Sequence, residues 1–356
     1  MLTLALLSKV TLTTLIAFRK LAPSIGLLDK PNERKLHTGQ IPLVGGISIC
    51  TALVLYLAHF HLIPDTHIYA VCIAFLTGVG ALDDKHDLSF KFRLVIQASL
   101  SAVMMLYADL ILVDLGNIFG FGEVNLGYFG YLITALAVIG AINAFNMVDG
   151  LDGLVGCLSI ITFSSLGILF IANGYKDIAL FCFALVAAII PYLLFNMGLF
   201  KEKRKVFMGD AGSMMIGFTV IWVLLLGSQN TETKSFNAAT ALWVIALPLM
   251  DMVATMLRRV IDGKSPFHPD RGHYHHALQD YGFNKRKTVL IMTLQAGCHA
   301  TIGVTSELFG ISEAVMFYGI LLMFCFHLCI LHHLRKNKKS KCEPSEVGLP
   351  SKNRQL

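Results

Sequence analysis

Apolar stretches of roughly 18 to 22 residues recur along the whole chain, and each is long enough to cross a bilayer core. Only 15% of the 356 residues are charged and the mean hydropathy is +0.66, whereas a soluble domain usually carries about 25% charged residues. Because backbone exposed to lipid must satisfy its own hydrogen bonds, each span is expected to be a helix. The sequence therefore predicts an all-α, polytopic helical membrane bundle of about eleven transmembrane helices. The expected spans are residues 2–18, 42–62, 68–82, 93–113, 129–147, 153–172, 178–199, 212–228, 238–257, 289–306 and 311–333.

Positive charges lie on alternate connections between these spans, which indicates the orientation of the chain. With the N-terminus outside the cytoplasm, all but three of the 29 lysines and arginines (Lys9, Lys176 and Lys234) follow odd-numbered spans. One span too many or too few would scatter these charges over both sides. We therefore expect the cytoplasmic loops to be residues 19–41, 83–92, 148–152, 200–211 and 258–288.

The remaining composition excludes several classes of protein. The net charge of +6 is spread over short loops, so it does not indicate nucleic-acid binding. The eight cysteines lie mostly in apolar stretches without a CxxC pair, which is typical of packing residues. In the first stretch the charges of Arg19 and Lys20 follow the apolar run, which favours a retained span over a signal peptide. Residues 1–334 are expected to form one membrane domain, and 335–356 a basic, disordered cytoplasmic tail near anionic headgroups.

An acidic cluster ends the third predicted span. Asp83 and Asp84 are adjacent, and Asp87 follows about one turn later. Three carboxylates this close repel one another without a cation, and their oxygens suit a hard divalent ion or a proton acceptor. The alternative is an acidic helix end solvated at the membrane surface. Arg93, shortly after the cluster, supplies positive charge for an anionic lipid headgroup.

Polar side chains recur at every third position where the fifth predicted span ends. They are Asn143, Asn146, Asp149 and Asp152. Residues three apart share one face of a helix, so this stripe is expected to face the protein interior or a water-filled cleft. Polar contacts between helices are the alternative, although four such groups exceed what packing needs.

A basic loop precedes a Gly-Asp-x-Gly turn at the start of the eighth predicted span. Backbone N–H groups at a helix N-terminus attract phosphate, so Asp210 would meet phosphate through a divalent cation. Phe207 is placed to stack on a base. The alternatives are anchoring of the topology for the lysines and an N-cap for Asp210.

The longest predicted cytoplasmic loop carries a histidine motif, His273-x-His275-His276, shortly after Arg271. The spacing permits zinc, yet no cysteine is close and no HExxH motif is present. Histidines beside an arginine suit a diphosphate better. All four motifs fall on one side of the membrane, where carboxylates are rarely kept without a task, so they predict a shared metal and phosphate site.

Together these motifs resemble the polyprenyl-phosphate N-acetylhexosamine-1-phosphate transferase family (glycosyltransferase 4). The resemblance runs in order from about residue 19 to 288, and five motifs in order are specific where each alone is modest. Tyr274, which separates His273 from His275, favours the hexosamine branch over the peptidoglycan branch, where three histidines tend to be consecutive. The matching elements are Leu28-Asp29-Lys30-Pro31 with Ile41 through Gly46, Asp83-Asp84-x-x-Asp87, Asn143-x-x-Asn146-x-x-Asp149-Gly-x-Asp152-Gly-Leu, Phe207-Met-Gly-Asp210-x-Gly-Ser213 and His273-x-His275-His276.

The resemblance implies a cytoplasm-facing cleft and transfer of GlcNAc-1-phosphate from UDP-GlcNAc to undecaprenyl phosphate, with release of UMP. It implies Mg²⁺ as cofactor, replaceable by Mn²⁺, and inhibition by tunicamycin. The setting would be the bacterial inner membrane, with a periplasmic N-terminus and a cytoplasmic C-terminus. The reaction would be the first membrane step of a cell-surface polysaccharide. Membrane lipid is an expected partner, nucleic acid is not, and a homodimer is left open.

The resemblance also assigns roles to single residues. The catalytic carboxylates would be Asp83, Asp84, Asp149 and Asp152, and the metal ligands would be Asp210 and Asn146. The nucleotide would contact Phe207, Asn196 and Asp152. Sugar and diphosphate would contact Arg271, His273, His275 and His276, and the lipid phosphate would contact Lys30 and Arg93.

Three alternatives stay open at this point. Within the family, the sugar phosphate could be GalNAc-1-phosphate or phospho-MurNAc-pentapeptide. A cation-coupled transporter is less favoured, because transporter acids lie near the membrane midplane and these acids lie at span ends. An intramembrane zinc hydrolase lacks its usual motif.

Overall fold

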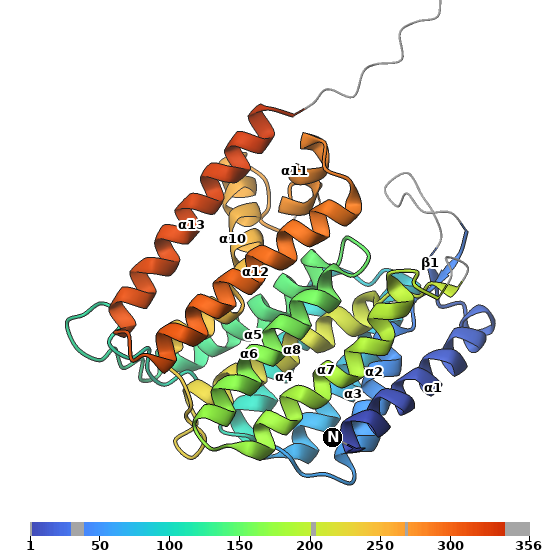
Figure 1. The fold of residues 1–356 in the computed structure, drawn as a ribbon, viewed down its shortest axis with the longest axis horizontal. Coiled ribbons are helices and arrows are strands. Elements are labelled where there is room, and N and C mark those ends of the chain that lie inside the picture. Colours follow the sequence, from blue (N-terminus) through green and yellow to red (C-terminus); the bar gives the residue numbers. More distant parts are fainter. Residues whose placement is uncertain (1, 30–38, 201–203, 268–269, 339–356) are drawn as a thin grey trace, which may run out of the picture.

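The computed structural model describes residues 2–29, 39–200, 204–267 and 270–338, which form a bundle of helices with one two-residue strand pair (Figure 1). The predicted class, a polytopic helical membrane bundle, is confirmed. Lys30 and most of the predicted tail, residues 339–356, lie outside the described residues. The elements are α1 (Leu2–Ile25), β1 (Leu28–Asp29), β2 (Ile41–Pro42), α2 (Gly45–Leu57), α3 (Thr66–His86), α4 (Phe90–Tyr107), α5 (Phe129–Val148), α6 (Leu154–Ala172), α7 (Lys176–Asn196), α8 (Gly209–Ser228), α9 (Ala238–Val244), α10 (Ala246–Ile261), α11 (Tyr274–Tyr281), α12 (Lys285–Leu308) and α13 (Glu313–Lys336).

Nine helices in the described part of the chain are long and apolar enough to cross a membrane, or ten if α9 and α10 count as one span. Each of the eleven predicted spans contains helix, but two of them do not contain one straight helix of full crossing length. The span predicted at 42–62 contains α2, which has only 13 residues and is shorter than a usual crossing. The span predicted at 238–257 is broken between α9 and α10 by a bend of 83°.

Pro248 explains the break between α9 and α10. A proline ring clashes with the carbonyl of the residue four positions earlier, which here is Val244, the last residue of α9. Pro248 is the third residue of α10. The N–H groups of the first turn of a helix have no partner within that helix, so a residue without an N–H group is tolerated there. The carbonyl of Val244 instead accepts a hydrogen bond from the Thr162 hydroxyl on α6 at 3.5 Å.

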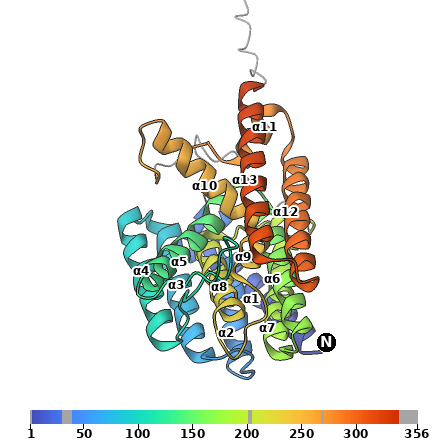
Figure 2. The same ribbon diagram turned by 90° about the vertical axis from the view of Figure 1, so that its left-hand side faces the viewer.

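Helix α8 lies at the centre of the bundle (Figure 2), and every residue of its most apolar 18-residue stretch is buried. It packs against α2, α3 and α5. A Cβ at Gly46 or at Gly80 would collide with the α8 backbone, and a Cβ at Gly217 of α8 would collide with Ile142 of α5. Because lipid tails are as apolar as the core, helices in a membrane associate by such close backbone packing.

Apolar side chains cover the outside of the bundle. Leu106 on α4 is 73% exposed and Leu322 on α13 is 65% exposed. In each of these two helices, only 22% of the residues in the most apolar 18-residue stretch are buried. Exposed apolar surface of this extent marks contact with lipid. The structure is thus that of a multi-pass membrane protein.

A short backbone junction ties the first loop to the start of α8. Phe207 donates its N–H to the carbonyl of Pro42 at 2.9 Å and accepts from Gly45 N–H at 2.9 Å, while Gly46 N–H donates to Met208 at 3.0 Å. The junction fixes the residues that precede α8 before the helix begins. It therefore positions the polar groups at the α8 N-terminus.

The close approach of α3 to α8 can be tested with two glycines on one helix. We expect Gly80→Ala to lower stability by about 1–3 kcal/mol, because its methyl group meets the Ala211 backbone, which cannot move aside. The matched control is Gly78→Ala, where nothing lies within 4 Å and the change should be neutral or stabilising by up to about 1 kcal/mol. Thermal unfolding of the purified protein measures both. Equal melting temperatures for the two variants would contradict the packing described.

Candidate active site

Asp83 is positioned by the tight turn between α3 and α4. Its Oδ1 accepts the N–H of Leu88 at 2.7 Å, and its Oδ2 pairs with the Arg93 guanidinium at 2.9 Å. Asp87 ends α3 with a left-handed backbone (φ 52°) and turns the chain toward α4. The Asp83 side chain is therefore buried, and each of its two oxygens has a donor, as a buried carboxylate requires.

Asp84 holds the N-terminus of α8. Its Oδ1 accepts from Asp210 N–H at 2.8 Å and its Oδ2 from Ala211 N–H at 3.2 Å. These N–H groups have no partner inside their own helix, and a negative charge there complements the helix dipole. Gly209, with φ +73°, leaves room for this carboxylate, because a Cβ would collide with Asp84 Oδ2. Asp84 thus fixes where Asp210 stands.

Asp210 receives donors from two helices. Asn146 on α5 donates from Nδ2 to Asp210 Oδ1 at 2.7 Å and to Ser213 Oγ at 3.0 Å. Arg93 lies 3.6 Å from Asp210 Oδ2, so one guanidinium stands between Asp83 and Asp210. The acids predicted from separate motifs share one site at the ends of α3, α5 and α8.

Asp149 and Asp152 lie in the turn that follows α5. Burial, together with the charges of Asp210, Asp84 and Asp152, raises the pKa of Asp149 well above its usual range. Asp152 has its own counter-ion, because Lys205 lies 2.7 Å from its carboxylate. Asp149 is therefore the acid in this group most suited to hold a proton.

The residues expected to bind a nucleotide differ in what they can touch. Asn196 is 3% exposed; it accepts from Gly153 N–H and donates to the carbonyl of Val206 at 2.9 Å. Its amide therefore ties the turn after α5 to the segment before α8, which suits a positioning role better than direct contact. Phe207 is half-buried on that segment, beside the acidic group.

The histidine motif meets the acidic group at Gly150. A Cβ at Gly150 would collide with His275 Nε2, so the ring packs directly on the turn that carries Asp149. The rings of His273 and His275 are stacked, with centroids 5.8 Å apart and an angle of 9° between their planes. Tyr274 instead contacts His327 of α13, with ring centroids 4.8 Å apart. The residue between the histidines thus anchors the motif to the bundle.

A basic cavity of about 300 Å³ opens beside this motif. Burial and the neighbouring His276 lower the pKa of His275 to about 3, and burial with Arg271 lowers that of His276 to about 4. Both rings are neutral at pH 7, and the positive charge of the wall comes mainly from arginines and lysines. The cavity is lined by Arg258, Lys264, Asp270, Arg271, Gly272, Ala277, Asp280, Leu334, Arg335 and Lys338.

The oxygen atoms of this group fit the Mg²⁺ or Mn²⁺ that the family implies. Within the described residues, no cluster of three or more His, Cys, Asp or Glu side chains is arranged as a ready metal site. Asp210 nevertheless offers a carboxylate, and Asn146 donates from its nitrogen, which leaves its carbonyl oxygen for a ligand. A carboxylate and an amide oxygen are the donors that a hard divalent cation prefers.

The structure corrects the predicted position of the acids along the chain. Residues 83–92 and 200–211 were expected to be loops, but Asp83 and Asp84 lie in the last turn of α3, and Asp210 lies in the first turn of α8. The helices extend into the site because Asp84 supplies the cap that the start of α8 would otherwise lack.

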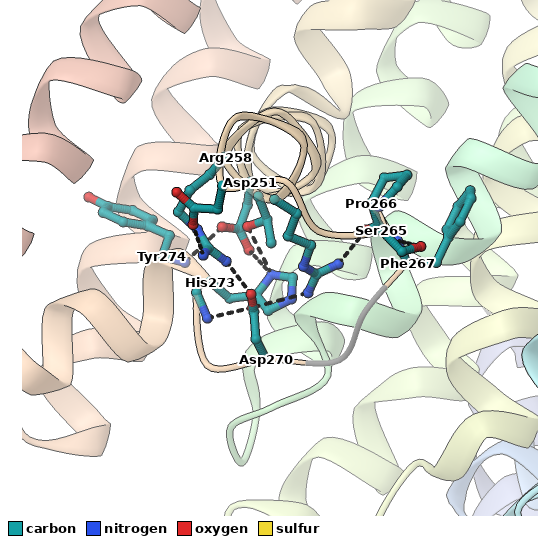
Figure 3. A network of polar contacts seen from close by, with 12 residues as sticks. Asp251, Arg258, Ser265, Pro266, Phe267, Asp270, His273 and Tyr274 are labelled. Atoms are coloured by element: carbon teal, nitrogen blue, oxygen red, sulfur yellow. Dashed lines mark hydrogen bonds and ion pairs between the residues drawn. The ribbon is translucent and has the colours of Figure 1, made fainter.

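Sequence reasoning missed one buried acid, Asp251 on α10, which contacts the histidine motif (Figure 3). It lies inside the predicted span 238–257. A carboxylate within an apolar span is by itself an indication of a functional site, so the sequence did contain the signal.

The lowered pKa of His275 predicts how stability depends on pH. Below about pH 6.5 the unfolded chain binds a proton at this residue and the native chain does not, so stability falls as the pH is lowered. The slope from this one group is about 1.4 kcal/mol per pH unit. We expect His275→Gln to flatten the fall in melting temperature between pH 7 and pH 5. The exposed His59→Gln is the control and should keep the wild-type slope. An unchanged slope in His275→Gln would refute the assignment.

Comparison with known proteins agrees with the site. The sequence model of glycosyl transferase family 4 matches residues 66–228, which include Asp83, Asp84, Asp149, Asp152 and Asp210. An undecaprenyl-phosphate alpha-N-acetylglucosaminyl 1-phosphate transferase of Escherichia coli (strain K12) is 48% identical over 330 residues, which are 91% of this chain and 90% of that protein. Proteins of the same name from Yersinia pestis and Haemophilus influenzae are 47% and 46% identical over 96% and 90% of this chain, and over 94% and 90% of their own lengths. With the family's motifs gathered into one site and this identity along nearly the whole chain, the protein belongs to glycosyl transferase family 4.

Proposed function

We propose that this protein transfers GlcNAc-1-phosphate from UDP-GlcNAc to undecaprenyl phosphate, giving GlcNAc-diphospho-undecaprenol and UMP. One observation carries the proposal: the acids at the ends of α3, α5 and α8 meet the histidine motif at Gly150. Such a site places carboxylates beside a basic wall, as the joining of two phosphate-bearing substrates requires. The relatives that are 46–48% identical are named for this reaction.

Arg93 is the residue that we assign to the lipid phosphate. It lies 2.9 Å from Asp83 and 3.6 Å from Asp210, and its side chain is 26% exposed. Its charge can therefore be shared with an incoming anion. Arginine suits this task because its planar group binds phosphate oxygens in pairs. Lys30, the other predicted contact, lies outside the described residues.

The basic wall is assigned to the nucleotide sugar. Arg271 lines the cavity beside the histidine motif and would bind the diphosphate by charge-assisted hydrogen bonds. His273, His275 and His276 would border the sugar and diphosphate, and Phe207 would stack on the uracil. Asp152 would lie near the nucleotide, with Lys205 balancing its charge.

Asp210 and Asn146 are proposed to hold Mg²⁺, or Mn²⁺ in its place. When bound, the ion would neutralise phosphate charge and so permit two anions to approach. Asp84 fixes the backbone of Asp210, and Asn146 fixes its carboxylate. The chain thus holds the proposed ligand in place from two sides.

The proposed reaction is an in-line displacement at the β-phosphorus of UDP-GlcNAc. An oxygen of the lipid phosphate forms the new P–O bond, and the bond to UMP breaks. Because a phosphate monoester has its second pKa near about 6, the attacking oxygen is largely deprotonated at neutral pH. Asp83 and Asp149 would accept any remaining proton, and Asp149 is suited to this by its raised pKa.

The proposed setting is the bacterial inner membrane, with a periplasmic N-terminus and a cytoplasmic C-terminus. The distribution of lysines and arginines supports this orientation. It places the site on the side where nucleotide sugars are made. A transporter is disfavoured, because the acids lie at helix ends and not at the midplane of the bundle.

The reaction is tested by incubating the purified protein with radiolabelled UDP-GlcNAc, undecaprenyl phosphate and Mg²⁺. We expect label to pass into the butanol phase with an equal amount of UMP. Asp210→Asn should lower the rate by about 100-fold or more, because it removes the charged ligand of the proposed Mg²⁺, which would neutralise the reacting phosphates. The exposed Asp177→Asn, at the first turn of α7, should keep wild-type activity. Transfer from UDP-GalNAc but not from UDP-GlcNAc would instead favour another branch of the family.

Metal dependence gives a second test. We expect EDTA to abolish transfer, and Mg²⁺ or Mn²⁺ but not Zn²⁺ to restore it, because the proposed ligands are oxygen atoms. In Asn146→Ala the concentration of Mg²⁺ needed for half-maximal activity should rise, since one proposed ligand is gone. An enzyme that stays active in EDTA, or that needs Zn²⁺, would refute the metal assignment.

A further inference from the structure

We propose that Asp251 is a positioning residue that orients the ring of His273, so that the second ring nitrogen of this histidine is directed at the nucleotide sugar. This inference rests on the proposed function and deepens it. No motif of the family resemblance above includes Asp251, and it touches neither the acids at α8 nor the basic cavity.

The geometry comes from a carboxylate that is almost completely buried (Figure 3). Asp251 is 1% exposed and His273 is 7% exposed. Asp251 Oδ2 lies 3.1 Å from His273 Nδ1, and Asp251 Oδ1 accepts the N–H of Tyr274 at 2.7 Å. Each oxygen therefore has one partner, and both partners belong to the start of α11.

This contact decides which ring nitrogen carries the proton. A buried carboxylate accepts and does not donate, so Nδ1 of His273 must be the N–H that points to Asp251. The Thr255 hydroxyl also lies 3.5 Å from Nδ1. Nε2, on the opposite side of the ring, is left for a ligand.

The other two histidines of the motif cannot take this part. His275 and His276 have pKa values lowered to about 3 and about 4 by burial and by their charged neighbours. Their Nδ1 atoms are buried without a hydrogen-bond partner among the described residues. Within the described part of the chain, His273 is the member of the motif whose ring contacts a carboxylate. Asp251 therefore fixes the ring orientation of His273.

The loop that precedes His273 is held independently of Asp251. Asp270 pairs with Arg258 and with Arg259, the latter at 3.1 Å, and accepts the N–H of Gly272 at 2.9 Å. Arg335 of α13 also donates to the Gly272 carbonyl at 2.6 Å. Because these contacts fix the backbone up to residue 272, replacing Asp251 is expected to change the ring of His273 more than the path of the loop.

Asp251→Asn separates the charge from the backbone contact. The amide keeps an oxygen for Tyr274 N–H but has no negative charge and no second acceptor for His273. We expect the KM for UDP-GlcNAc to rise about tenfold or more, with the KM for undecaprenyl phosphate unchanged within about twofold. The control is Asp262→Asn, an exposed acid just beyond the same helix that pairs with Arg258; its kinetics should match the wild type.

A double variant tests whether Asp251 acts through His273. In Asp251→Asn with His273→Ala, we expect the KM for UDP-GlcNAc to equal that of His273→Ala alone within about twofold. Multiplied effects, or equal rises in the KM of both substrates, would mean that Asp251 serves the fold only, and would overturn the inference. Wild-type protein that transfers nothing from UDP-GlcNAc would instead refute the proposed function.

A second pair of variants covers the case in which Asp251→Asn does not fold, as judged by size-exclusion chromatography. Asp251→Glu and Asp251→Gln have side chains of equal length, and only the glutamate keeps the negative charge and a second acceptor oxygen. We expect the glutamate variant to keep the lower KM for UDP-GlcNAc. Equal KM values in these two variants would overturn the inference.

Discussion

The contact between Asp84 and the N-terminus of α8 is the interaction on which the rest of the site depends. The backbone N–H groups of Asp210 and Ala211 would be unpaired at a buried helix start, and the Asp84 carboxylate satisfies both. The contact is possible only because α3 and α8 approach closely at Gly80, and because Gly209 adopts a positive φ. Packing of glycine against backbone inside the bundle therefore sets the position of a carboxylate at its edge.

A group of acids this dense is stable only if its charges are balanced. Arg93 serves Asp83 and Asp210, Lys205 serves Asp152, and Asn146 donates to Asp210. Asp149 is buried and has neighbours of its own charge, and both effects raise its pKa. The negative charge of this group is thus only partly balanced. A bound divalent cation, or a phosphate bound by an arginine, would change the net charge of the site strongly. That is the electrostatic state expected of a site built to bind ions.

The sequence predicted most of the helices and most of the acidic site, for physical reasons that are easy to name. The membrane spans follow from the length and hydropathy of the apolar stretches. The distribution of lysines and arginines among the loops agrees with the number of spans. The prediction from sequence failed where contacts between segments distant in the chain decide the structure. Helix α3 continues through Asp84 because α8 supplies the partner, and no local pattern shows that. The sequence also does not show that both ends of the Asn196 amide hold backbone, and the contact of Asn196 with a nucleotide stays a prediction. The close contact of His275 with Gly150 joins residues 125 positions apart and has no signature in spacing.

Asp251 differs from these cases, because a carboxylate within a predicted span can be recognised in the sequence. The break between α9 and α10 explains why a carboxylate can lie there. A carboxylate in a continuous span would face lipid or the crowded interior at high cost. Pro248 ends α9 at Val244 and bends the chain by 83°, so Asp251, three residues later, enters the space beside the histidine motif. There the Tyr274 N–H and the His273 ring supply the donors that a buried carboxylate requires. The proline, the acid and the histidine therefore depend on one another: without the bend the acid has no partners, and without the acid the first turn of α11 has no cap.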